Sequence, residues 1–116
     1  MTAPDIETVR AAARGLAPAL YQRLANFDAM VMPTVPTVPP KLDDVEHNGD
    51  NYNLANALAL RNTTLANLLP SCAVTLPLAG EIPCGLMVMA PAGHDNRLLR
   101  VAAVIEEALD LPGSAD

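Results

Sequence analysis

Residues 71–91 read SCAVTLPLAGEIPCGLMVMAP, and this stretch decides the fold of the chain. It holds two apolar runs, at residues 73–77 and 85–90, with the turn-forming residues Ala-Gly-Glu at 79–81 between them. Short apolar runs bounded by Gly and Pro are typical of buried strands. The stretch therefore predicts two strands joined by a turn.

The residues that follow carry the pattern of a helix. Asp95 is placed to cap this helix, and the Leu-Pro-Gly sequence at 111–113 is placed to end it after Leu109. Its apolar positions recur on one face, at Leu98, Val101, Ala102, Ile105 and Leu109. This spacing predicts an amphipathic helix from Asp95 to Leu109.

The residues before the stretch, 52–69, are strong helix formers. Their apolar positions lie roughly on one stripe, at Leu54, Leu58, Leu65 and Leu68. The polar run Asn-Thr-Thr at 62–64 leaves two alternatives open, a continuous helix or two shorter pieces. Pro70 and Ser71 end the pattern.

Further upstream, the sequence predicts two short helices and a third strand. Thr2 and Asp5 resemble the cap of the first helix, which Gly15 and Pro18 interrupt. The apolar face of the first helix holds Ile6, Val9 and Ala13, and that of the second holds Leu16, Leu20 and Leu24. The run Ala-Met-Val-Met at 29–32 is short and bounded by proline, as a buried strand would be.

Residues 33–51 predict a long connection. PTVPTVPP at 33–40 cannot donate regular ladder hydrogen bonds at its prolines, so an extended, polyproline II conformation is expected. KLDDVEHNGDN at 41–51 is polar and acidic and predicts an exposed loop. The P-x-x-P spacing lacks a flanking Arg or Lys at its start, which favours an internal loop over a ligand for a polyproline-binding domain.

Strands that alternate with helices indicate an α/β fold, with a partial sheet of about three strands flanked by helices. Because the strands are continuous apolar runs, both of their faces are expected to be buried. The length of 116 residues fits one domain, residues 1–116. Its core must be built from Ala, Leu, Val and Met, since only two Tyr and one Phe are present.

Charge and hydropathy exclude several classes of partner. The net charge is −6 and the seven basic residues are spread along the chain, which argues against nucleic acid. The apolar runs are too short to span a membrane, and MTAPDIETVR at 1–10 lacks the features of a signal peptide. We therefore expect a soluble, cytoplasmic protein.

Metal and cofactor sites are not expected. His47 and His94 have no second His or Cys at ligand spacing, and the acidic run after Asp44 lacks the carboxylate that a calcium loop needs at Ala55. Cys72 and Cys84 are expected to be small buried residues, although a bridge between them stays open. A Ser-His-Asp triad from Ser71, His94 and Asp95 fails because Ser71 is not in a G-x-S-x-G turn.

Five segments occur in an order and spacing that resemble the C-terminal part of the amidase-signature family. They are D-A-M-V-M-P-T at 28–34, R-N-T-T-L-A-N-L-L at 61–69, A-V-T-L-P at 73–77, G-L-M-V-M-A-P at 85–91 and D-N-R-L-L at 95–99. The resemblance covers nearly the whole chain. It implies a fragment of an α/β/α sandwich that is built around a mixed sheet.

The resemblance carries over no catalytic residue. Family members use a serine nucleophile, a bridging serine and a lysine base, in segments that precede the part matched here, with an oxyanion held by a glycine-rich turn. This chain has one lysine, Lys41, in a polar segment, and two serines, Ser71 and Ser114, outside any glycine-rich turn. The turn at 81–85 is also shorter than the family's Gly-Leu-Pro-x-Gly turn.

One helix contributes candidates for a substrate pocket. Arg61 interrupts an apolar helical stripe, so it either pairs with a carboxylate or reaches a polar cleft. The resemblance places the Arg-Asn-Thr region near the substrate cleft. The pocket candidates are Arg61, Asn62, Thr63 and Asn67.

Two classes of function follow. The first is a C-terminal segment of an amide (C–N bond) hydrolase that is inactive alone, either as a truncated reading frame or as half of a split enzyme. The second is an interaction subunit that completes the sheet of a partner chain carrying the catalytic residues, or a module that associates with itself. Unpaired strand edges favour such pairing.

Overall fold

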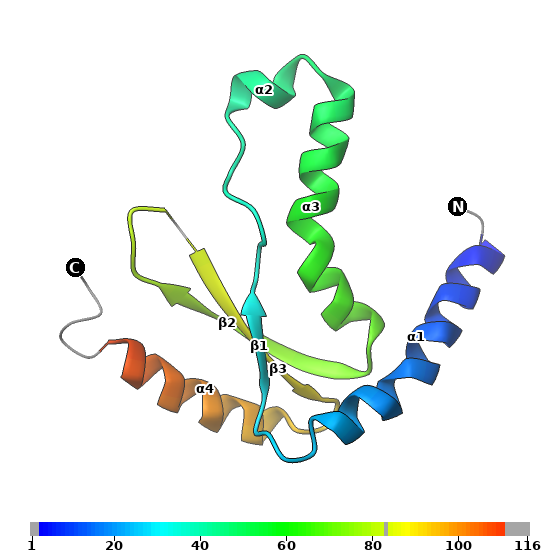
Figure 1. Cartoon of the computed structure of the whole chain (residues 1–116), viewed down its shortest axis with the longest axis vertical. Coiled ribbons are helices and arrows are strands. Elements are labelled where there is room, and N and C mark those ends of the chain that lie inside the picture. The colour runs from blue at the N-terminus through cyan, green and yellow to red at the C-terminus, as the bar shows by residue number, and fades with distance from the viewer. Residues whose placement is uncertain (1–2, 83, 111–116) are drawn as a thin grey trace.

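The computed structural model describes residues 3–82 and 84–110 of the chain. Helices and strands follow one another as α1 (Ala3–Arg23), β1 (Met30–Pro33), α2 (Leu42–Glu46), α3 (Gly49–Leu68), β2 (Ser71–Leu78), β3 (Cys84–Pro91) and α4 (Asp95–Leu109) (Figure 1). The expected α/β class, with three strands flanked by helices, is confirmed.

The sheet has the order β1-β3-β2, and both pairings are antiparallel. Val88 in the central strand β3 lies opposite Val31 of β1 and Val74 of β2. Because β3 has a neighbour on each side, it holds the most buried part of the sheet, residues 87–90. The hairpin predicted from residues 71–91 is therefore the centre of the fold.

Two small hydrophobic clusters lie on the sheet. One joins α4 to the sheet and contains Leu76, Val88, Ala90, Leu98 and Ala102. The other joins the C-terminal half of α1 to the end of α3 and to β3, and contains Ala17, Leu69 and Met89. The apolar stripe predicted for α4 is confirmed, since Leu98 and Ala102 are buried and the other members are half-buried.

The expectation that both faces of each strand are buried is wrong for the two outer strands, β1 and β2. Exposed and half-buried residues alternate in β1, and β2 shows a similar pattern in which only Leu76 is buried. The physical reason is that both are edge strands with at most one well-covered face, as is common in antiparallel sheets.

The helix boundaries correct one expectation and decide one alternative that the sequence left open. The helix α1 continues through Gly15 and Pro18, where two helices were predicted. Pro18 is exposed, so water can bond the carbonyl group that lacks a partner there. The helix α3 is not broken at 62–64.

The acidic segment 41–51 is not a loop as predicted. It contains α2, and the Oδ1 atom of Asn48 caps α3 by accepting from the backbone N–H groups of Asp50 and Asn51, both at 3.1 Å. Asp95 is the first residue of α4 rather than its cap, which is His94. Thr2 and residues 111–113 lie outside the described residues.

The molecule is flat and open. Its radius of gyration is 16.9 Å and it measures 42 × 41 × 19 Å, whereas a compact chain of this length has a radius of gyration of about 13 Å. Its accessible surface is 8480 Å², against about 6,100 Å² for a compact monomer of this mass. Figure 1 shows the reason: α1 and the α2–α3 pair extend away from the sheet.

Candidate functional site

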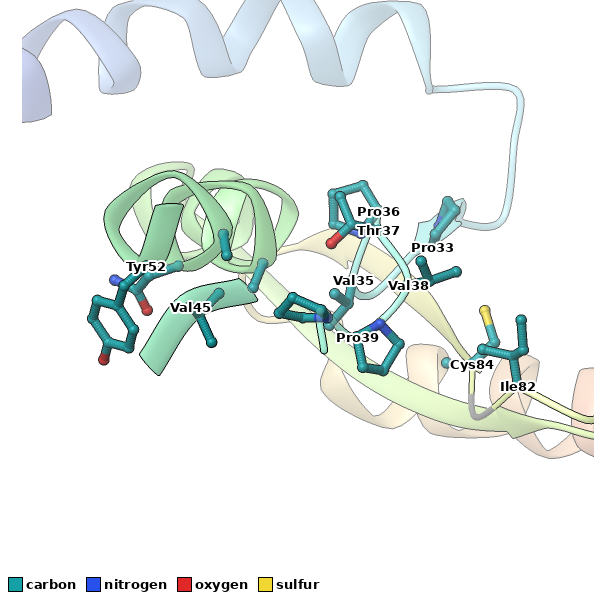
Figure 2. Close-up of a pocket in the computed structure, with 15 residues that line it drawn as sticks. Pro33, Val35, Pro36, Thr37, Val38, Pro39, Val45, Tyr52, Ile82 and Cys84 are labelled. Carbon is teal, nitrogen blue, oxygen red and sulfur yellow. The ribbon is translucent and has the colours of Figure 1, made fainter. Parts of the chain in front are cut away.

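A large cavity lies beside the proline-rich segment 33–40 and has a volume of about 630 Å³. Its walls come from this segment, from one face of α2 and α3 and from the end of the β2–β3 turn. Figure 2 shows Val35, Val38 and Pro39 between Val45 and Tyr52 on one side and Ile82 and Cys84 on the other. The lining is completed by Pro33, Pro36, Thr37, Pro40, Ala55, Asn56, Ala59 and Gly85.

The lining of this cavity is mainly apolar. Among the described residues that line it, the polar side chains are Thr37, Tyr52, Asn56 and Cys84, and none is Asp, Glu, His, Lys or Arg. A nucleophile needs an adjacent base, and the lining supplies none. The cavity can therefore receive an apolar group or an apolar chain segment.

None of the four predicted pocket residues lines this cavity. Asn62 comes nearest, because its Nδ2 atom donates to the carbonyl oxygen of Pro33, a lining residue, at 2.6 Å. Thr63 donates its hydroxyl to the Leu60 carbonyl at 3.1 Å, within its own helix. Asn67 is exposed. A role for these residues in substrate binding stays a prediction.

Arg61 is exposed, and its side chain contacts the neighbouring Asn62, with an Nε to Oδ1 distance of 3.5 Å. The expected carboxylate partner is not among its contacts in the part of the chain that the structure describes. The guanidinium group thus remains accessible at the surface of α3.

The cavity wall formed by residues 33–40 was missed as a site by sequence reasoning, which treated these residues only as an internal loop. The signal was present in the alternation of Pro with Val35 and Val38, because extended residues with apolar side chains make a rigid apolar surface. A second signal was Tyr52, the only aromatic residue in the sequence after Phe27.

We expect Asn62→Ala to lower the free energy of unfolding by about 0.5–1.5 kcal/mol, since the Pro33 carbonyl loses its donor. Asn67→Ala is the matched control on the same helix, because Asn67 is exposed and both changes raise helix propensity alike. Urea unfolding of both variants measures the difference. Equal midpoints would show that the Asn62 bond contributes nothing.

The residues that could imitate a catalytic group are engaged elsewhere or isolated. The Ser71 hydroxyl donates to the Ala66 carbonyl at 2.8 Å, and Lys41 is exposed directly before α2, a helix that lies away from the sheet (Figure 1). Within residues 3–82 and 84–110, no three His, Cys, Asp or Glu side chains lie together as a metal site would require. Ser114 lies outside the described residues.

The two cysteines are free. Cys72 is half-buried and lies opposite Ala90, whereas Cys84 is exposed and lies opposite Leu78 at the other end of the same strand pair. The alternative of a bridge between them is therefore wrong, because the register separates them by most of the length of the hairpin. The expectation that both are buried fails for Cys84.

Tyr21 links α1 to the start of β2, since its hydroxyl donates to the Pro70 carbonyl at 2.7 Å. Burial of the hydroxyl raises the pKa of Tyr21 above its usual value; the nearby Cys72 adds to the rise, and a hydrogen bond with Ser71 partly opposes it. The folded state holds the Tyr21 proton more tightly than the unfolded state does. The contribution of the protonated Tyr21 hydroxyl to folding stability is therefore complete below the pKa of Tyr21 in the unfolded chain, and it is lost as the pH rises through the pKa of Tyr21 in the folded chain.

In a Tyr52→Phe variant, where Tyr21 is the only tyrosine, we expect the folded protein to ionise at higher pH than the urea-unfolded protein, whose midpoint should be about 10. Ultraviolet absorbance of tyrosinate follows the titration. A folded midpoint at or below the unfolded one would contradict the assigned environment of Tyr21.

One ion pair connects segments that lie far apart in the sequence. Arg97 of α4 contacts Asp28 just before β1, with a distance of 2.5 Å between Nη2 and Oδ1. Both side chains are at least half exposed, so the pair contributes little stability. It nevertheless brings together two of the five segments that were singled out in the sequence.

The three-stranded antiparallel sheet and the helices that flank it define a member of the α/β class. Comparison with known proteins defines the family: residues 3–99 match the family described as Amidase. The chain belongs to the amidase family. No helix in the described part of the chain is long and apolar enough to cross a membrane.

Curated relatives support the same assignment. The chain is similar to 2-amino-5-chloromuconic acid deaminase of Comamonas testosteroni, with 40% identity over 84 residues that cover 70% of this chain and 18% of the relative. It is also similar to one subunit of the glutamyl-tRNA(Gln) amidotransferase of Halobacterium salinarum, with 32% identity over 88 residues that cover 74% of this chain and 20% of that protein.

Indoleacetamide hydrolase of Agrobacterium vitis is 28% identical over 102 residues, which cover 83% of this chain and 22% of the relative. The chain thus spans about a fifth of the length of these relatives. No solved structure matches it.

Proposed function

We propose that this chain is the C-terminal scaffold segment of an amide (C–N bond) hydrolase, inactive by itself. It supplies one end of the enzyme's sheet and one wall of a substrate cleft. The nucleophile and base come from the Ser-Ser-Lys part of an amidase, which the 116 residues do not contain. Arg61, Asn62, Thr63 and Asn67 would face substrate only in the assembled enzyme.

The observation that carries this proposal is the accessible surface. The chain exposes 8480 Å², about 2,400 Å² more than a compact monomer of its mass. Permanent interfaces bury more than about 2,000 Å² in total, so the excess has the size of an obligate contact. The exposed apolar side chains on α1, α3 and α4 suit such a contact, among them Leu16, Leu54 and Val104.

An activity test distinguishes a scaffold segment that is inactive alone from a chain that is itself an enzyme. We expect the purified chain to release no ammonia from simple amides or from 2-amino-5-chloromuconic acid. In a chimera, this chain replaces the segment of the Comamonas deaminase that it matches. The chimera should fold and release ammonia from 2-amino-5-chloromuconic acid. The deaminase with that segment deleted is the control. Turnover by the chain alone, or a folded but inactive chimera, would overturn the proposal.

A second candidate is an interaction subunit or self-associating module without a catalytic role. Much of α1 favours it, because Ile6, Val9 and Leu16 are exposed by 38%, 45% and 67%. The apolar face predicted for this helix thus has no cover from the described residues over most of its length. Light scattering tests the self-associating module, which requires a stable mass at least twice the 12.2 kDa of one chain.

The cytoplasmic location expected from the sequence remains part of the proposal. Cell fractionation of the tagged chain, with cytoplasmic and exported marker proteins beside it, measures it directly. Recovery in the exported fraction would contradict it.

A further inference from the structure

We propose that the cavity beside segment 33–40 selects an uncharged apolar group of a small molecule over an anionic one, and that in the assembled enzyme this group is part of the amide substrate. The inference rests on the proposed function, because it names the kind of substrate that the enzyme would take. Three properties of the cavity support it: its volume, its shortage of hydrogen-bond donors and the acidic residues around it.

The cavity has the size of a ligand site. Its volume of about 630 Å³ lies within the range of about 300–1,000 Å³ for pockets that hold small molecules. Val38 and Ile82 are exposed along it, and Tyr52 lies on its other side (Figure 2). A ligand between these side chains would remove apolar surface from water. Ala59 of α3 limits the size of the ligand, because its short side chain leaves the space open.

The proline-rich wall is short of hydrogen-bond donors. Four of the eight residues at 33–40 are prolines, which have no backbone N–H. The N–H of Thr34 is already used, because it donates to the Gly85 carbonyl at 2.7 Å. A carboxylate that loses its water needs donors or a cation in exchange. This wall therefore suits an uncharged group.

Acidic residues surround the cavity. Asp44 and Glu46 line two smaller cavities that share Val45 with it, and Asp50 lies in the first turn of α3. Lys41 is the only Lys or Arg between residues 24 and 60 of the sequence. The charge around the cavity is thus negative, and it raises the cost of placing an anion there.

Both walls are held in place without a ligand. The Pro33 carbonyl accepts from Asn62 of α3 at 2.6 Å, which joins the proline-rich segment to the helix. On the other wall, Nδ2 of Asn51 donates to the Asp44 carbonyl at 3.0 Å and joins α3 to α2. A preformed pocket loses less binding free energy to the ordering of its own groups.

The occupant we assign is a small molecule rather than a side chain from the rest of the enzyme. A cavity of about 630 Å³ is larger than any single side chain. The cavity also adjoins the surface that the proposed function assigns to substrate, since Asn62 bonds directly to the lining residue Pro33. A protein segment that fills the cavity is the alternative that the test must separate.

A pair of substitutions tests the place of binding. Ala59→Leu fills part of the cavity from α3. Ala57→Leu is the matched control, because Ala57 is exposed on the same helix and is not among the lining residues. The two changes alter helix propensity alike. Circular dichroism and urea midpoints check that both variants keep the fold of the isolated chain.

Two probes of similar shape test the kind of ligand. They are para-toluamide, which carries a methyl group, and terephthalamate, which carries a carboxylate in its place. We expect para-toluamide to shift the backbone NMR signals of Tyr52, Asn56 and Ala59 in a saturable manner, and terephthalamate to bind about tenfold more weakly or less near neutral pH. Ala59→Leu should weaken the binding of para-toluamide about tenfold, and Ala57→Leu should leave it unchanged. If Ala59→Leu fails to fold, the two probes on the wild type still decide the preference.

The chimera with the Comamonas deaminase tests the role in the assembled enzyme. We expect para-toluamide to inhibit its release of ammonia competitively, since the probe would occupy part of the substrate site. Ala59→Leu in the chimera should raise the inhibition constant about tenfold, and Ala57→Leu should not change it.

The outcomes separate this inference from the function on which it rests. An inactive chimera, with binding by the isolated chain intact, would overturn the proposed function and the assignment to substrate, but not the site. Failure of the isolated chain to bind para-toluamide, equal binding of the two probes or binding that survives Ala59→Leu would overturn the site alone. Binding to the chain without inhibition of an active chimera would show that protein fills the cavity, and would overturn the assignment to substrate.

Discussion

Leu98→Ala should lower the free energy of unfolding by about 2–5 kcal/mol, the range for truncating a buried leucine. Leu98 is 2% exposed and joins α4 to Leu76, Val88 and Ala90 of the sheet. The core is thin, so few neighbouring side chains are available to refill the space. Urea unfolding followed by circular dichroism measures the loss.

The adjacent residue supplies the control. Leu99 of α4 is 58% exposed, and Leu99→Ala should change stability by less than about 0.5 kcal/mol. Both changes remove the same atoms from neighbouring positions of one helix, so their difference reports packing alone. Similar losses for the two variants would contradict the placement of α4 on the sheet.

Gly85→Ala should destabilise the chain by about 1–3 kcal/mol, the usual cost of inserting a methyl group into filled space. A Cβ atom at Gly85 would lie 2.7 Å from Cγ2 of Thr75 and 2.9 Å from Oγ1 of Thr34. These two threonines share a hydroxyl hydrogen bond of 3.1 Å, which passes across the central strand where Gly85 has no side chain. The substitution would separate them.

Two further variants check the cause. Gly15 has nothing within 4 Å of an added Cβ, so Gly15→Ala in the helix α1 should stabilise by about 0.5–1 kcal/mol. Adding Thr75→Ser to Gly85→Ala removes the closest methyl group and keeps the hydroxyl, so part of the loss should be recovered. If the double variant is no more stable than Gly85→Ala, the steric explanation is wrong.

Much of the fold could be predicted because local patterns coincide with tertiary burial. The runs at 73–77 and 85–90 became β2 and β3, and the stripe on α4 faces the sheet. The predictions of helix and loop were wrong where one local sequence signal competes with another. Pro18 stays in α1 because its position is exposed, and the acidic run at 41–51 forms α2 and the cap of α3 although its composition is typical of a loop.

The candidate site was predicted less well. Arg61, Asn62, Thr63 and Asn67 were chosen by resemblance, and among them only Asn62 makes a hydrogen bond beyond its own helix. The cavity beside residues 33–40 needs α3 and the β2–β3 turn to approach a segment far away in the sequence. Spacing along the chain contains no signal for that approach.

The sequence by itself determined the α/β class, the central hairpin, the face of α4 that is buried and the absence of a serine and lysine pair in a glycine-rich setting. These depend on residue type and on periodicity, which are local properties. Only the tertiary structure decided that β3 is the central strand and that Asn62 of α3 reaches Pro33, because both depend on the strand order, on the register and on the approach of α3 to β1. These are contacts between distant segments, and they are fixed only when the chain folds.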